Sequence, residues 1–230
     1  SCKIFMKRII LILFIPLSIM LHAQEIKTVQ DFGVWTGYQL NKEKTDKLSW
    51  RIKNELRLFN NAASIDNLFF EYGLKYKLDA HFKMGINLRH SFKFSRAGAF
   101  DNNDRIDFNM YYKRELSKPL KFYYRLKFQQ TFIDLFNTYT SHGYYKTAYR
   151  NKVLLKYKVN KKHRASISSE LFRLAVPAKP AYFSKMRFVI GDKIKLNKNA
   201  LNLALGIERE LGTDNPLTFY YTRIVYGFNL

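Results

Sequence analysis

The sequence predicts an all-β chain that folds into a single antiparallel, up-and-down transmembrane β-barrel of 10–12 strands, preceded by a cleaved signal peptide. Three observations lead to this prediction. Apolar and polar residues alternate along most of the chain, which is typical of strands with two different faces. The alternating segments are mostly longer than the ~5–6 residues of soluble strands and match the ~9–11 residues of a tilted membrane strand. Short turns also alternate with longer loops, as in outer-membrane barrels.

The first 23 residues have the three parts of a secretory signal peptide. A basic start is followed by an apolar run over residues 9–21 and by the small residue Ala23. The run is shorter than the ~20 residues of a membrane helix, which favours a cleaved signal. We therefore expect residues 1–23 to be removed and residues 24–230 to form the barrel. Cys2, the single cysteine, lies in the predicted signal, so no disulfide is expected.

The chain is strongly basic, with a formal charge of +22 and 17% aromatic residues. Loss of the predicted signal removes three basic residues and leaves +19. A basic aromatic chain could bind nucleic acid, but an export signal argues against that partner. We expect outer-membrane lipids and lipopolysaccharide as partners instead. Lysines in the predicted short turns would meet anionic head groups: Lys118, Lys161, Lys162 and Lys198.

Eleven segments carry the strand pattern. It is clearest over residues 67–78, where Leu68 to Leu78 form an apolar face and Glu71 belongs to the opposite, polar face. The segments, in chain order, are 31–40, 48–58, 67–78, 82–94, 105–116, 120–132, 146–159, 163–174, 185–196, 200–211 and 217–230.

The direction of the first segment does not fit a simple barrel. If the short turns lie in the periplasm, the last strand ends there at Leu230, and segment 31–40 runs in the same direction as that strand. Bacterial single-chain barrels have even strand numbers. We therefore expect ten or twelve wall strands, with 31–40 either outside the wall or joined by a further strand.

The number of strands and the positions of the aromatic residues indicate which face of each strand points outward and which lines the interior. A soluble lipocalin-like barrel would place the apolar face inside, but ten or more strands would then enclose a large hollow. Aromatic residues near strand ends favour membrane interfaces. The polar face is therefore predicted to line the lumen. Its charged members are Arg51, Lys53, Glu55, Arg57, Glu71, Lys75, Arg89, Asp107, Arg125, Lys127, Arg150, Lys152, Glu170, Arg187 and Glu208.

The chain resembles the domain-of-unknown-function family 2490, a group of predicted outer-membrane barrels of Gram-negative bacteria. The likeness covers nearly the whole exported chain. It rests on Trp35, Trp50, Glu55-Leu56-Arg57, Phe59-Asn60, Phe70 to Leu78, Arg89, Arg150-Asn151-Lys152 and Glu170-Leu171-Phe172. The ending, Tyr226 to Leu230, is similar to the terminal-strand signal read by the barrel-assembly machinery, although Leu230 stands where an aromatic residue is common. The resemblance implies this architecture, localisation and assembly partner, and no activity.

Two groups of residues are candidates for chemistry. Ser141 and His142, with Asp134, could perform acyl transfer as a Ser/His/Asp arrangement. Asp101 and Asp104 offer oxygen ligands of the kind that Ca²⁺ takes, in a segment predicted to be an external loop. No cofactor is expected, because the sequence has no Gly-rich phosphate loop and no histidines at metal-ligand spacing.

The function remains open between three classes. The sequence favours a non-enzymatic outer-membrane barrel, either a narrow anion-preferring pore or a structural barrel. The first alternative is a lipid-modifying enzyme, an acyl hydrolase or deacylase. The second is a soluble periplasmic barrel that binds lipid.

Overall fold

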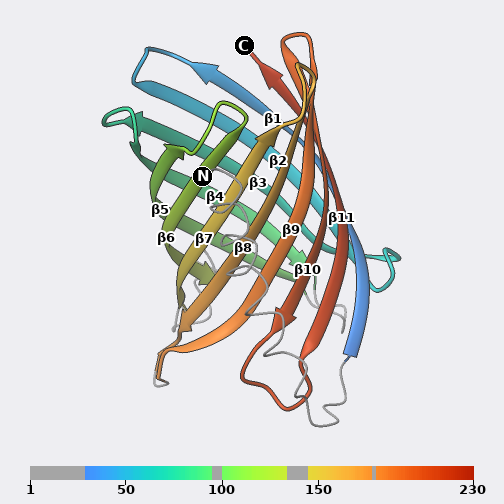
Figure 1. The fold of residues 1–230 in the computed structure, drawn as a ribbon. Helices are drawn as coiled ribbons and strands as arrows, with labels where there is room; N and C mark the ends of the chain where they lie inside the picture. Colours follow the sequence, from blue (N-terminus) through green and yellow to red (C-terminus); the bar gives the residue numbers. More distant parts are fainter. Residues whose placement is uncertain (1–28, 95–99, 134–144, 178–179) are drawn as a thin grey trace, which may run out of the picture.

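The strands of the chain close into one barrel (Figure 1). The computed structural model describes residues 29–94, 100–133, 145–177 and 180–230. The elements are β1 (Val29–Glu43), β2 (Leu48–Phe59), β3 (Ser64–Lys77), β4 (Phe82–Phe94), β5 (Phe100–Glu115), β6 (Leu120–Ile133), β7 (Tyr145–Lys158), β8 (His163–Ala175), β9 (Tyr182–Leu196), β10 (Asn199–Glu210) and β11 (Leu217–Asn229). The predicted all-β barrel of 10–12 strands is confirmed, whereas the predicted signal, residues 1–23, lies outside the described residues.

The barrel closes through a parallel pair. Every strand pairs antiparallel with its neighbours in sequence, but β1 pairs parallel with β11, from Val29 opposite Leu217 to Asn41 opposite Asn229. The expectation of ten or twelve wall strands was therefore wrong, because segment 31–40 belongs to wall strand β1. Segment 31–40 does run in the same direction as the last strand, as the sequence indicated. Because the two strands pair in parallel, the barrel closes without a further strand.

The two rims of the barrel differ. We call the rim formed by the short connections β1–β2, β3–β4, β5–β6, β7–β8 and β9–β10 the turn rim, and the opposite one the loop rim (Figure 1). Leu230 lies at the turn rim, where its N–H donates to the Asn41 carbonyl at 2.9 Å. At the loop rim, the tight β2–β3 turn contains Asn60 and Asn61 at φ 56° and 54°. Asn tolerates this left-handed region, and Asp31 accepts both backbone N–H groups at 3.1 and 3.0 Å.

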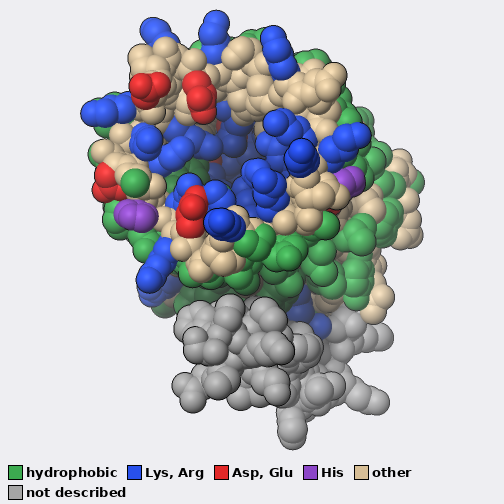
Figure 2. Space-filling model, turned by 45° about the horizontal axis from the view of Figure 1, so that its top comes forward, with side chains coloured by type: hydrophobic (Ala, Val, Ile, Leu, Met, Phe, Trp, Pro, Cys, Tyr) green, Lys and Arg blue, Asp and Glu red, His purple; other side chains and the backbone are tan. Residues whose placement is uncertain are grey.

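The outer wall is apolar and the inner face is charged. Leu74, Leu88, Ile190 and Leu205 are exposed on the outer wall, the last two at 64%. Figure 2 shows this apolar surface around the wall and the Lys and Arg side chains around the opening at the turn rim. Strand alternation explains the separation, since successive side chains point to opposite faces. Among the described residues, no helix has the length and apolar character needed to span a membrane.

Candidate functional site in the charged lumen

Buried carboxylates lie on the inner face of the barrel at mid-depth. They come from five strands and are at most 9% exposed: Glu55, Glu71, Asp107, Glu170 and Glu208. Each forms ion pairs with Arg or Lys side chains, most of them on other strands. We call these carboxylates and their cationic partners the charged layer. Because an unpaired buried charge is costly, the cations around each carboxylate are what allow it to remain ionised.

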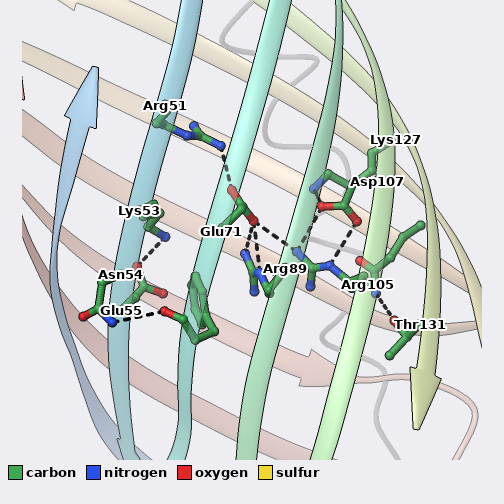
Figure 3. Close-up of polar contacts among 12 residues, drawn as sticks. Arg51, Lys53, Asn54, Glu55, Glu71, Arg89, Arg105, Asp107, Lys127 and Thr131 are labelled. Atoms are coloured by element: carbon green, nitrogen blue, oxygen red, sulfur yellow. Dashed lines mark hydrogen bonds and ion pairs between the residues drawn. The ribbon is translucent and has the colours of Figure 1, made fainter. Parts of the chain in front are cut away.

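Glu71 is the centre of one part of the charged layer (Figure 3). It pairs with Arg51 at 2.7 Å on β2 and with Arg89 at 2.5 Å on β4. Arg105 on β5 lies 3.4 Å from the same carboxylate and also pairs with Asp107 at 3.0 Å. The charged contacts therefore run across four neighbouring strands without a break.

Glu170 on β8 organises the far side of the lumen. It pairs with Arg125, with Arg150 at 2.8 Å and with Arg187 at 3.6 Å. Arg187 also reaches Glu208 on β10 at 2.5 Å. Such charge-assisted hydrogen bonds are stronger than those between neutral groups. Two carboxylates are thus held by cations from β6, β7 and β9.

Aromatic rings fill the space between the cations. Phe69 is fully buried on the inner face, with the Arg89 guanidinium 3.6 Å from its ring centre. Trp35 stacks on Tyr221 at 3.7 Å and carries the Arg57 guanidinium at 3.9 Å. Such cation–π contacts are worth ~0.5–2 kcal/mol each. They add packing to a layer that would otherwise consist of charges alone.

Three cavities lie along the lumen. A central cavity of about 470 Å³ is lined by the charged layer. A cavity of about 780 Å³ lies at the turn rim; we call it the turn-rim cavity. A third, of about 360 Å³, lies toward the loop rim. The charged layer therefore separates two outer cavities.

The two outer cavities carry opposite charge. Of the described residues around the turn-rim cavity, only Glu43 is acidic, and eight are Lys or Arg: Lys42, Arg51, Lys75, Lys83, Lys113, Arg125, Lys152 and Lys156. Most of the charged residues described around the loop-rim cavity are acidic. The cavity has Asp31, Asp66, Asp101, Glu208 and Glu210, against Arg57, Lys93 and Lys185. An anion is therefore attracted to the turn-rim opening, which Figure 2 shows ringed by basic side chains.

The structure places the charged residues predicted for the lumen as follows. All but Asp107 and Glu208 line the central cavity. Asp107 is fully buried in the charged layer, and Glu208 lines the loop-rim cavity. Sequence reasoning missed Arg105, Lys185 and Arg223, which also line the central cavity. Arg105 shares the parity of Asp107 on β5, and this could have revealed it.

The residues suggested for chemistry do not form a site in the described chain. Asp101 and Asp104 lie in strand β5 rather than in a loop, so that prediction of their position was wrong. Asp101 lines the loop-rim cavity, whereas Asp104 meets His90 Nδ1 at 2.8 Å, so the two carboxylates do not converge. No group of three potential metal ligands occurs in the described part of the chain. Ser141, His142 and Asp134 lie outside the described residues.

Comparisons with known proteins identify a family but no activity. The family described as "Protein of unknown function (DUF2490)" matches residues 32–215. No curated protein matches the chain. Among solved structures, the β domain of the Bordetella autotransporter BrkA is similar, with 10% sequence identity and a TM-score of 0.46. That match covers 80% of this chain and 82% of the β domain.

Proposed function

The chain belongs to the DUF2490 family of proteins of unknown function, and we propose that it is an integral outer-membrane barrel that admits small anions at its turn rim. The observation that carries the proposal is the basic turn-rim cavity inside an apolar wall. Charge rings of this kind set ion selectivity in pores. The proposal places the turn rim in the periplasm, because outer-membrane barrels have their short turns there.

The wall supports residence in a membrane. In hydrocarbon, backbone N–H and C=O groups have no water to bind, so a spanning sheet must close on itself. The eleven strands do close, and outward-facing side chains such as Leu88 and Ile224 are apolar. Washing membranes with alkaline carbonate tests this directly. An integral barrel remains in the outer-membrane fraction, and release into the wash would contradict the proposal.

Planar-bilayer recordings test the anion preference. Under a KCl gradient, purified protein should give a reversal potential of the sign set by chloride. The triple variant Lys75→Gln, Lys152→Gln and Lys156→Gln should lower the anion-to-cation ratio, because it removes three positive charges from the turn-rim cavity. Cation preference in the unchanged protein would contradict the proposal.

A matched control removes the same charge from outside the lumen. Lys47, Lys161 and Lys198 lie exposed in connections of the turn rim. Their combined change to Gln also lowers the net charge by three. Since these side chains stand outside the turn-rim cavity, the anion preference should change less than in the lumen variant. Equal changes would mean that total charge, rather than the lumen, determines selectivity.

A structural barrel is the second candidate. The charged layer fills the lumen at mid-depth with paired side chains, and narrow barrels can be filled in this way. Absence of conductance from correctly folded protein would favour this candidate over the pore.

The other predicted functions have less support. A soluble lipid binder needs an apolar cavity, whereas this central cavity is lined mainly by charged side chains. The lipid-modifying enzyme stays a prediction, because Ser141 and His142 lie outside the described residues. Incubation with phospholipid and lipopolysaccharide checks it: unchanged lipids, or full activity after Ser141→Ala, would remove it.

A further inference from the structure

Three lysines of the turn-rim cavity differ from the other inner-face cations that define the charged layer. Lys127 and Lys53 each form an ion pair at 2.5 and 2.7 Å. Among the described residues, no carboxylate lies within ion-pair distance of Lys75, Lys152 or Lys156. Glu170 attracts Lys152 from farther away, but arginines already surround that carboxylate. Among the described residues around the cavity, eight Lys or Arg side chains therefore face a single acidic one, Glu43.

Neighbouring cations repel the three lysines of the turn-rim cavity. Lys75 and Lys156 line the same cavity as Arg51 and Lys83. Like charges in a partly desolvated cavity repel one another more strongly than in bulk water. An anion bound between them would relieve this repulsion as well as form new ion pairs.

Two of the three lysines lie close to tyrosine rings of the inner face. Lys75 Nζ lies 5.2 Å from the centre of the Tyr111 ring, and Lys156 Nζ lies 4.7 Å from that of Tyr123. Both tyrosines line the same cavity as the lysines. The volume of about 780 Å³ is within the ~300–1,000 Å³ range of small-molecule sites.

We propose that the turn-rim cavity binds a compact polyvalent oxyanion, a solute that carries phosphate groups, through Lys75, Lys152 and Lys156. Several ammonium groups around one cavity match an anion with several charges, and each contact is a charge-assisted hydrogen bond. This inference rests on the proposed function and names the class of anion. The same phosphate chemistry occurs in lipid head groups. A free solute fits better, because the lysines face the lumen while the apolar surface is on the outer wall.

Inorganic pyrophosphate is the probe. Titration calorimetry on the purified protein in non-ionic detergent should show saturable binding, and pyrophosphate should raise the unfolding temperature, since a ligand of the native state stabilises it. The triple variant Lys75→Gln, Lys152→Gln and Lys156→Gln should bind at least about tenfold more weakly, through loss of charge-assisted bonds. The variant with Lys47, Lys161 and Lys198 changed to Gln should bind as the unchanged protein does.

The following outcomes test this site, and two of them separate it from the pore. Equal pyrophosphate binding by folded triple variant and unchanged protein overturns the site, as does absence of binding. Anion-preferring conductance without pyrophosphate binding overturns the site and leaves the pore. Binding without conductance supports the site and contradicts the pore. In nanodiscs, loss of pyrophosphate binding when phosphatidylglycerol replaces phosphatidylcholine would assign the site to lipid head groups and overturn the free-solute version.

Discussion

Glu55 on β2 accepts a hydrogen bond from Arg223 Nε on β11 at 2.8 Å, across the strand that lies between them. The intervening strand, β1, presents Gly37 beside Glu55. The ion pair therefore bridges the parallel seam between the first and last strands of the barrel. Glu55 also pairs with Lys53 at 2.7 Å and Arg57 at 2.8 Å and is fully buried.

The change Glu55→Gln should strongly destabilise the barrel. It leaves three cations close together without their shared carboxylate, and removing one partner of a buried ion pair costs about 3–5 kcal/mol. Denaturant unfolding in lipid vesicles, followed by tryptophan fluorescence, measures the loss. Arg223→Gln should cost less, because Glu55 keeps two partners and Arg223 is 32% exposed. If Arg223→Gln lost more stability than Glu55→Gln, the contact across the seam would matter more to stability than the charge balance around Glu55.

The change Gly37→Ala should weaken the contact between β1 and β2. A Cβ at this position would lie 2.2 Å from the Asn54 carbonyl oxygen and 2.8 Å from Glu55 Cα, both in the backbone. Overpacking of this kind costs about 1–3 kcal/mol. Gly227→Ala is the control, since its nearest neighbour, the Ala200 carbonyl oxygen, would be 3.5 Å away. The same unfolding measurement should show a loss for Gly37→Ala alone; equal losses would contradict the steric explanation.

Acid should loosen the β3–β4 turn at the turn rim. The backbone N–H groups of Phe82 and His81 donate to Asp79 at 2.8 and 2.6 Å and hold the pKa of its carboxyl below the ordinary value. Because the pKa is lower in the folded turn, the stabilisation is complete above the unfolded pKa and is lost as the pH falls through the folded one. A carboxyl ¹³C titration should give a lower pKa in the protein than in a peptide of residues 76–84. Equal values would contradict this explanation.

Period-two alternation predicted the faces of the strands but not how the barrel closes. The pattern over β3 assigned Leu74 to the outward face and Glu71 to the lumen, and in the structure Leu74 is exposed on the outer wall and Glu71 is buried inside. The same pattern contains no information about which strand lies next to β1. Pairing depends on backbone hydrogen bonds between segments far apart in the chain, and these are available in parallel as well as antiparallel form.

Part of the candidate site was missed because the inner face of β11 carries several apolar residues. On β11 the inward residues include Phe219, Tyr221 and Val225, which pack with Trp35 or lie buried nearby. Where both faces carry apolar residues, alternation becomes weak and Arg223 is not distinguished. The ion-pair partners could not be predicted either. They depend on register between strands, as for Glu71 opposite Arg89.

The parallel seam also joins the two most distant segments of the barrel sequence. Every other pair of neighbouring strands is a hairpin of adjacent segments, which can form while the rest of the chain is still unpaired. Val29 meets Leu217 only when nearly the whole domain is present, so this contact has by far the largest loop-closure entropy. Without β11, β1 would face β10 in the antiparallel sense, and a ten-stranded closure would compete. Incorporation of β11 therefore distinguishes the observed barrel from this shorter alternative.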